Sequence, residues 1–211
     1  MVSAILLAAG ESRRMGEQNK LLLPFRNSTF IAHIADQLLH SEAEEVLVVL
    51  GYQAEAVQDV LTGRPLRFVH NPDYPQGMTT SIRAGVRAAS PNSQGYMICL
   101  SDLPFVEASD YTELIRTFNQ LRSESPNVLV RPAWQGKPGN PVLFSSEYRD
   151  AILTHPKMEG CRGLIREHAE CVRLVEMPND HTLRDIDTPE EYERFLSEDA
   201  PLDPARGTLS K

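Results

Sequence analysis

Residues 3–20 decide the fold and read SAILLAAGESRRMGEQNK. The stretch begins with an apolar run, continues with two alanines and a glycine, and ends with two arginines and a lysine. Such a run before a glycine indicates a buried strand that enters a tight loop. Small residues let the loop backbone approach a ligand closely, and consecutive N–H groups there can bind a triphosphate. We therefore expect a strand followed by a phosphate-binding loop.

This loop also carries positive charge. Lys20 and either Arg13 or Arg14 supply it, and such cations form strong hydrogen bonds with phosphate. Gly10 and Gly16 can adopt the positive φ that such a loop needs. The loop lacks both the Gly-Lys-Ser/Thr of a Walker loop and the Gly-x-Gly-x-x-Gly of a dinucleotide site. The alternative is a tight strand–helix turn whose arginines are only solvated.

Short apolar runs recur along the chain and alternate with helical patterns. Further strands are expected at residues 45–50, 66–70, 96–100, 128–131, 142–144 and 172–175. Helices are expected at residues 29–39, 54–61, 79–89, 109–121 and 190–196, with Ser109 as an N-cap. Strands that are apolar throughout favour a parallel sheet covered on both faces. We predict a single-domain, Rossmann-like α/β fold with a mostly parallel twisted sheet and ligands beyond the carboxyl ends of its strands.

Composition limits the classes of function. The chain has 211 residues, 41% hydrophobic and 24% charged, which suits one medium domain. Its formal net charge of −8 disfavours nucleic acid and anionic membranes as partners. Three cysteines without zinc spacing indicate a reducing compartment, and without a basic leader or a membrane-length apolar stretch we expect a cytoplasmic protein. We assign residues 1–196 to the domain and residues 197–211 to a flexible tail.

Residues 71–82 (NPDYPQGMTTSI) predict a second binding element. Proline and glycine make the first part a loop, and Gly77 precedes a helix. The first backbone amides of that helix and the Ser81 hydroxyl would face a pocket. The alternative is simple helix capping by Thr79 or Thr80.

Acidic residues at two places are candidate metal ligands. Asp102 follows the strand expected at residues 96–100, and magnesium prefers such hard oxygen ligands while keeping phosphates and waters in its shell. The alternative for Asp102 is helix capping or turn formation. Asp185 and Asp187 are two residues apart, so in extended backbone they point to the same side. One of them can reach the metal while the other caps.

The segment at residues 6–25, LLAAGESRRMGEQNKLLLPF, resembles the signature of nucleotidyltransferases of the molybdenum-cofactor type. That family includes the guanylyltransferase and the cytidylyltransferase of molybdopterin and is related more distantly to sugar-phosphate nucleotidyltransferases. The resemblance implies a nucleotide-diphospho-sugar transferase-like fold and favours Arg13 over Arg14 for phosphate. The alternative for Arg14 is that it is only a solvated neighbour. It assigns a wider set to the nucleotide site: Ala8, Ala9, Gly10, Ser12, Arg13, Arg14, Gly16 and Lys20.

Later segments resemble other elements of that family, in the same order. Residues 77–81 (GMTTS) are similar to an element beside the base and ribose, which implies nucleotide contacts for Gly77, Met78 and Ser81. Residues 185–191 (DIDTPEE) are similar to its ending, where Asp187 completes the metal site.

Two further elements imply an acceptor site. Residues 136–142 (GKPGNPV) are similar to an element beside the acceptor, which implies that Gly139 and Asn140 contact the molybdopterin phosphate or the triphosphate. Residues 160–163 (GCRG) are similar to a later element but carry Cys161 where the family has an acid. Arg162 would there meet an anionic substrate.

The resemblance predicts cytidylyl transfer from CTP to molybdopterin with release of pyrophosphate. Magnesium on Asp102 and Asp187 neutralises the phosphates, while Arg13 and Lys20 hold the leaving group. A molybdoenzyme or its chaperone is a possible recipient of the product. The alternatives are a GTP-dependent guanylyltransferase, cytidylyl transfer to a sugar or polyol phosphate, and a non-catalytic nucleotide- or cofactor-binding chaperone. A dehydrogenase is disfavoured because the dinucleotide fingerprint is missing.

Overall fold

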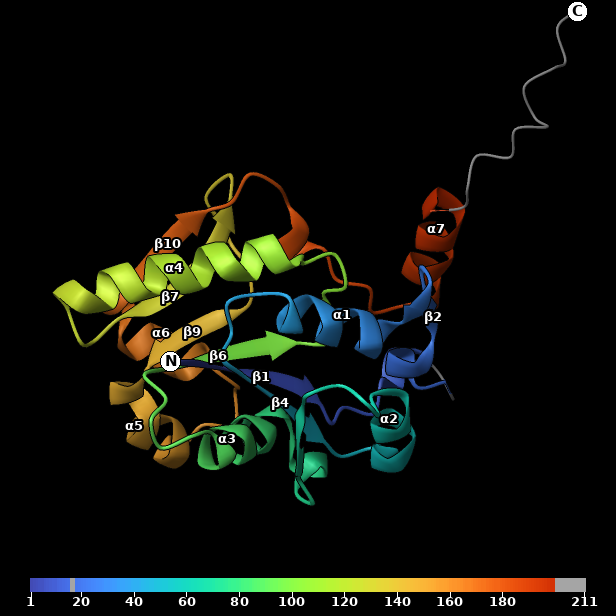
Figure 1. The fold of residues 1–211 in the computed structure, drawn as a ribbon, viewed down its shortest axis with the longest axis horizontal. Coiled ribbons are helices and arrows are strands. Elements are labelled where there is room, and N and C mark those ends of the chain that lie inside the picture. The colour runs from blue at the N-terminus through green and yellow to red at the C-terminus, as the bar shows by residue number, and fades with distance from the viewer. Residues whose placement is uncertain (16–17, 200–211) are drawn as a thin grey trace, which may run out of the picture.

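The fold is built on one eight-stranded sheet. The computed structural model describes residues 1–15 and 18–199, with the backbone alone described at Arg13 and Asp199. In this part of the chain the strand order is β10-β7-β9-β6-β1-β4-β5, and β8 pairs with β7 (Figure 1). The strands are β1 (Val2–Ala8), β4 (Glu45–Leu50), β5 (Arg67–His70), β6 (Gly95–Leu100), β7 (Leu129–Trp134), β8 (Lys137–Pro138), β9 (Val142–Ser145) and β10 (Val172–Glu176).

Most neighbouring strands are parallel, as predicted. β1 pairs in parallel with β4 and β6, β4 with β5, and β10 with β7. The longer exception is β9, which is antiparallel to both β6 and β7. Every residue of β1 is buried, because helices cover both faces of the sheet. The predicted mostly parallel, Rossmann-like α/β fold is confirmed.

Helices on the two faces of the sheet enclose separate cores. They are α1 (Phe30–Leu39), α2 (Ala54–Val60), α3 (Met78–Ala88), α4 (Ala108–Glu124), α5 (Arg149–Thr154), α6 (Arg162–Glu167) and α7 (Pro189–Asp199). α1, α2 and α4 pack with Leu6 in one core, while α3, α5 and α6 pack with Ile5 in the other. Adjacent residues of β1 serve opposite cores because side chains alternate across a strand.

Helix ends differ in several places from the sequence-based expectation. Thr29 caps α1 by accepting a hydrogen bond from the Ala32 N–H at 3.4 Å. The prediction that Ser109 caps α4 is wrong, because α4 begins at Ala108 with Glu107 as its N-cap. There the Asp110 carboxylate accepts a hydrogen bond from the Glu107 N–H at 3.0 Å. α7 continues to Asp199, so residues 197–199 are helical, and the rest of the expected tail lies outside the described residues.

An aromatic cluster holds α7 beside the N-terminal hairpin of β2 (Pro24–Phe25) and β3 (Ser28–Thr29) (Figure 1). Phe25 and Phe195 stack at 4.5 Å between ring centroids. Ile186, just before α7, is buried in the same cluster. The last described helix is therefore fixed next to the beginning of the chain, which brings the acidic segment before it close to the first loop.

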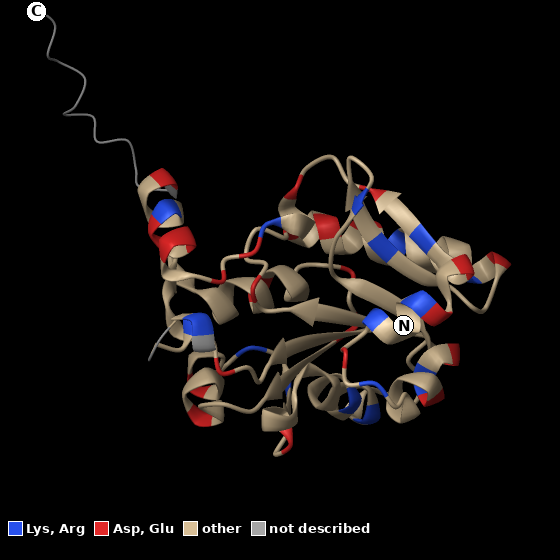
Figure 2. Ribbon diagram, turned by 180° about the vertical axis from the view of Figure 1, so that it is seen from behind, with Lys and Arg blue, Asp and Glu red and all other residues tan. Residues whose placement is uncertain are grey.

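Charge lies mainly outside the central strands. Figure 2 shows Lys, Arg, Asp and Glu on the helices, the loops and the outer strands, and neither β1 nor β6 carries a charged residue. Among the residues that the structure describes, no helix is long and apolar enough to cross a membrane.

Candidate functional site

A cleft of about 440 Å³ opens at the carboxyl ends of β1 and β6. The parallel register pairs Leu7 with Leu100, so the chain leaves both strands at the same place. The first loop, the start of α3 and two distant aspartates meet there. The predicted residues that line the cleft are Ala9, Gly10, Ser12, Lys20, Gly77, Met78, Ser81, Asp102 and Asp187.

The first loop follows the prediction in position but not in every backbone detail. Ala8 is fully buried in β1 and does not line the cleft. Gly10 does line it, but without the positive φ that glycine allows, and Ser12 has the positive φ in this loop, at 50°. Gly16 and the side chain of Arg13, both assigned to phosphate binding by resemblance, lie outside the described residues.

Lys20 and Arg14 both bind Asp187 across the cleft. The Lys20 side chain is only 8% exposed, and its Nζ lies 2.7 Å from Asp187 Oδ1. Arg14 Nη2 donates to the other carboxylate oxygen of Asp187. The alternative that Arg14 is only a solvated neighbour is therefore wrong, because Arg14 lines the cleft and forms this ion pair. The residues lie 167 positions or more apart along the chain, so no local pattern predicts the contact.

Asp102 has the features of a cation ligand. Its Oδ1 is buried and has no hydrogen-bond partner among the described residues. Burial raises the pKa of Asp102, the positive charge of Lys20 opposes this shift, and the negative charge of Asp187 adds to it. A buried carboxylate oxygen without a donor is costly, and a bound cation would satisfy it.

The structure distinguishes the two late aspartates. Asp187 lines the cleft and Asp185 does not. Burial acts to raise the pKa of Asp187, but the hydrogen bonds and charges of Lys20 and Arg14 outweigh it and lower that pKa overall. Burial raises the pKa of Asp185, and the neighbouring Asp187 adds to this shift.

The arrangement of acids suits magnesium bound partly by its substrate. Across residues 1–15 and 18–199 there is no group of three or more His, Cys, Asp or Glu side chains that could hold a metal alone. Asp102 and Asp187 both line the cleft and could supply two carboxylates to a divalent cation, whose remaining ligands would be phosphate oxygens and water.

The start of α3 lies at the cleft, where Gly77, Met78 and Ser81 line it. Gly77, with φ of 110°, is its N-cap and forms no side-chain cap, so the alternative of capping by Thr79 or Thr80 is wrong. Asn71 Nδ2 donates to Ser81 Oγ at 3.0 Å and fixes this buried hydroxyl at the cleft wall. A helix N-terminus with free amides favours anionic ligands.

The three residues assigned to the acceptor do not line the cleft. The Gly139 carbonyl accepts hydrogen bonds from Arg131, and the Asn140 N–H donates to the Thr182 carbonyl at 3.1 Å. Arg162 is exposed at the first position of α6. Their contact with a substrate therefore remains a prediction, and the structure shows instead what Gly139 and Asn140 touch within the protein.

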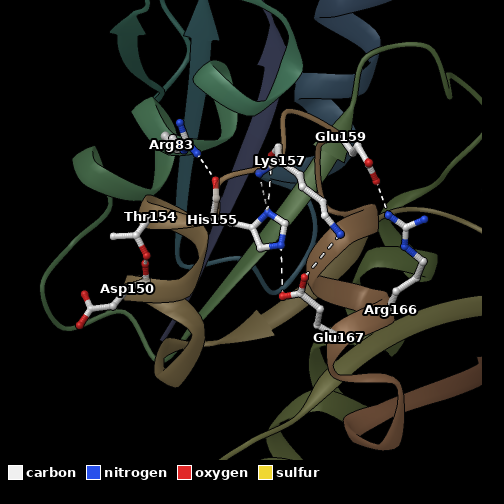
Figure 3. Close-up of polar contacts among 8 residues, drawn as sticks. All are labelled: Arg83, Asp150, Thr154, His155, Lys157, Glu159, Arg166 and Glu167. Atoms are coloured by element: carbon white, nitrogen blue, oxygen red, sulfur yellow. Dashed lines mark hydrogen bonds and ion pairs between the residues drawn. The ribbon is translucent and has the colours of Figure 1, made fainter.

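A polar cluster fixes the connection between α5 and α6 against α3 (Figure 3). His155 is 7% exposed, and its Nε2 lies 3.2 Å from Glu167 Oε2. Arg83 of α3 donates to the His155 carbonyl, and Lys157 Nζ lies 3.8 Å from Glu167 Oε1. Further along, the Gly160 N–H donates to Thr79 Oγ1 at 2.9 Å. This connection therefore packs beside Met78, because a Cβ on Gly160 would lie 3.3 Å from Met78 Sδ, although the connection itself does not line the cleft.

Some residues that line the cleft were missed by sequence reasoning: Leu7, Glu11, Met15, Leu21, Tyr74, Pro75, Leu100 and Ser101. Tyr74 shows why. A Cβ placed on Gly51 would lie 2.7 Å from Tyr74 Cγ and 2.8 Å from Ala9 Cβ, so the tyrosine packs tightly there. Tyr74 and Pro75 belong to a stretch read only as a loop, and a contact with Gly51 leaves no local signal.

Comparison with known proteins identifies relatives over nearly the whole chain. The model of the MobA-like NTP transferase domain matches residues 4–172. The nicotine blue oxidoreductase of Paenarthrobacter nicotinovorans is 30% identical over 204 residues, which cover 92% of this chain and 96% of that protein. The molybdenum cofactor cytidylyltransferase of Escherichia coli (strain K12) is 28% identical over 194 residues, which cover 90% of this chain and 93% of that protein.

Solved structures share the fold. Rv0371c from Mycobacterium tuberculosis H37Rv superposes with a TM-score of 0.81 at 23% identity, covering 93% of this chain and 97% of that one. A complex of Rv0371c with manganese superposes with a TM-score of 0.77 at 22% identity, covering 93% of this chain and 98% of that one.

Proposed function

The chain belongs to the MobA-like NTP transferase family, and from this premise we propose that it transfers CMP from CTP to molybdopterin and releases pyrophosphate. The observation that carries the proposal is the shared cleft. Lys20 and Asp187 meet at 2.7 Å in a cleft that Asp102 and the N-terminus of α3 also line, and Asp102 Oδ1 has no hydrogen-bond partner within the described part of the chain. A triphosphate needs cations and amides for its charge, and its metal needs carboxylates.

The residues of the cleft have distinct roles in this reaction. Asp102 and Asp187 would hold magnesium, which when bound neutralises phosphate charge. Lys20, Arg14 and Arg13 would bind the phosphates, and the backbone of Ala9 and Gly10 would bind them through N–H groups. Gly77, Met78 and Ser81 would contact the nucleoside.

The chemical step needs positioning more than proton transfer. A phosphate oxygen of the acceptor attacks the α-phosphorus of CTP, and the bond to the pyrophosphate oxygen breaks. A phosphate monoester is already partly deprotonated near neutral pH, so a dedicated base is unnecessary. The cleft holds donor and acceptor in line and stabilises the charge that moves onto pyrophosphate.

Sequence elements and one relative support the choice of CTP and molybdopterin. The Ala-Ala-Gly of the first loop and residues 77–81 and 139–142 resemble the cytidylyltransferase branch. A relative over 90% of the chain is named a molybdenum cofactor cytidylyltransferase. Cys99, Cys161 and Cys171 are free thiols, which supports a reducing cytoplasmic setting, where a molybdoenzyme or its chaperone would receive the product.

One relative favours a second candidate function. The protein from Paenarthrobacter nicotinovorans is named an oxidoreductase, and it is 30% identical to this chain. Reduction of a small molecule is therefore a competing activity. The sequence lacks Gly-x-Gly-x-x-Gly, so a nicotinamide dinucleotide would have to bind without that fingerprint.

Pyrophosphate release decides between these functions. We expect release with CTP only when molybdopterin and Mg²⁺ are present, about tenfold faster than with GTP, ATP or UTP, because base choice rests on a few contacts. A parallel assay with a sugar phosphate in place of molybdopterin tests the alternative acceptor. A second parallel assay, with reduced nicotinamide dinucleotide and a quinone dye, tests the oxidoreductase activity. Release with GTP alone would overturn the cytidine assignment, and nicotinamide oxidation without any pyrophosphate release would overturn the transferase.

A further inference from the structure

Residues 177–187, which we call the strap, join β10 to the last helix and cross the edge of the sheet that carries the cleft. We propose that Gly139 and Asn140 are positioning residues that hold the strap in place and thereby present Asp187 to the cleft. The consequence for metal and nucleotide binding rests on the proposed function, whereas the contact between the turn at residues 139–140 and the strap stands on geometry alone.

The strap is tied to four successive positions along the sheet edge. β7, β9, β6 and β1 are neighbours in that order, and the strap passes each of them in turn. At β7, the Met177 N–H donates to the Ala133 carbonyl at 2.7 Å, and just before β9, the Asn140 N–H donates to the Thr182 carbonyl at 3.1 Å. After β6, the Ile186 N–H donates to the Asp102 carbonyl at 3.0 Å. In the loop that follows β1, Lys20 forms an ion pair with Asp187 at 2.7 Å. The last two ties bring both candidate metal ligands together.

The second tie leaves no room for a side chain at residue 139. A Cβ on Gly139 would lie 2.4 Å from the Thr182 carbonyl oxygen and 2.9 Å from Thr182 Oγ1. Thr182 is 1% exposed and cannot move outward without losing its packing. Arg131 holds the other side of the turn, since its Nη2 donates to the Gly139 carbonyl at 3.0 Å. Glycine is therefore required for the strap to approach this turn.

A side-chain contact fixes the strap next to the same tie. His181 Nδ1 lies 2.9 Å from Asp110 Oδ2, and Asp110 is 4% exposed in the first turn of α4. Thr182 and Asp187 are five residues apart, and Ile186 between them is buried in the aromatic cluster. The short segment has little slack, so a displacement at Thr182 is expected to reach Asp187.

A double-mutant cycle tests this transmission without any ligand. In the wild type, Asp187→Asn removes the partner of the buried Lys20 and lowers the unfolding midpoint. In a Gly139→Ala background we expect the strap to be displaced already. Asp187→Asn should then lower the unfolding midpoint by roughly half as much as it does in the wild type, or less. Lys137→Ala is the matched control: Lys137 is exposed on the same hairpin, and the cost of Asp187→Asn should there equal that in the wild type.

A binding measurement distinguishes failure of this inference from failure of the proposed function. Gly139→Ala should weaken binding of CTP in the presence of Mn²⁺ by about tenfold, with Lys137→Ala unchanged. If the wild type binds no CTP, the proposed function is refuted. The double-mutant cycle uses no ligand, so it still tests whether Gly139 and Asn140 position Asp187.

The cycle also has an outcome that overturns the inference. An equal cost of Asp187→Asn in the wild-type and Gly139→Ala backgrounds would show that the turn does not hold Asp187. If Gly139→Ala does not fold, Arg131→Met replaces it, because it releases the Gly139 carbonyl without adding a clash. A reduced cost of Asp187→Asn in that background supports the inference, and an unchanged cost refutes it.

Discussion

At the scale of single residues, the cleft gives its two aspartates opposite electrostatic surroundings. Asp187 is bound by Lys20 and Arg14, whereas Asp102 keeps a buried oxygen without a donor among the described residues. An unpaired buried carboxylate costs stability and persists only where function requires it. Removal of Asp102 should therefore harm activity and not folding.

Replacement of Asp102 by alanine tests this expectation. We expect Asp102→Ala to lower Mg²⁺-dependent pyrophosphate release by about 10²-fold or more, because a group that neutralises phosphate charge is lost. The unfolding midpoint should be unchanged or higher. Asp185→Asn is the control, since Asp185 lies outside the cleft lining and should lose far less turnover. Undiminished turnover of Asp102→Ala would refute the assigned ligand.

At the scale of elements, Glu45 ties the start of β4 to its neighbours. Its side chain is 11% exposed, and Oε2 accepts hydrogen bonds from Ser3 Oγ at 2.6 Å and the Ser90 N–H at 3.0 Å. Oε1 pairs with Arg67 of β5. Burial acts to raise the pKa of Glu45, but these donors outweigh it and lower the pKa overall.

The pH dependence of stability follows from the direction of this shift. A folded pKa below the unfolded value of about 4.3 means that ionised Glu45 stabilises the fold above that pH. We expect Glu45→Gln to cost about 2 kcal/mol at pH 7, and the difference from wild type to vanish as the pH falls below the folded pKa.

Urea unfolding between pH 3 and pH 7 measures that difference. Glu44→Gln is the control, because the Glu44 side chain is 53% exposed and its pair with the N-terminus is worth little. A difference that stays constant across this range would show that ionisation of Glu45 is not the source of its contribution.

At the scale of the whole molecule, the aromatic cluster closes the chain on itself. Phe195 of α7 is 7% exposed and stacks on Phe25 of the N-terminal hairpin. Tyr192 OH also donates to the Pro24 carbonyl at 2.8 Å. This closure brings the strap and its aspartate to the first loop.

Phe195→Ala should therefore be costly. We expect a loss of about 3 kcal/mol in the free energy of unfolding, since truncation of a buried phenylalanine leaves a cavity. Leu196→Ala is the matched neighbour, because Leu196 is 46% exposed and should change stability little. Urea unfolding of the two variants gives both values, and equal losses would argue that α7 is not anchored through Phe195.

Much of the fold and part of the cleft could be predicted from the sequence. Each apolar run forms a strand, and Gly10, Lys20 and Asp102 reach the cleft, because parallel strands deliver the segments that follow them to one edge. The prediction from the sequence placed the N-cap of α4 at Ser109. In the structure the N-cap is Glu107, whose N–H donates to the Asp110 carboxylate three residues later.

The amino-acid sequence alone determined the alternation of strands and helices and the chemistry of the first loop, since apolar runs, glycines and prolines act over a few residues. Only the tertiary structure decided that Asp187 and not Asp185 faces Lys20, and that Gly139 meets Thr182. These pairs are separated by 167 and 43 residues, so their contact depends on the sheet order and on the packing of α7. No local pattern specifies either of these.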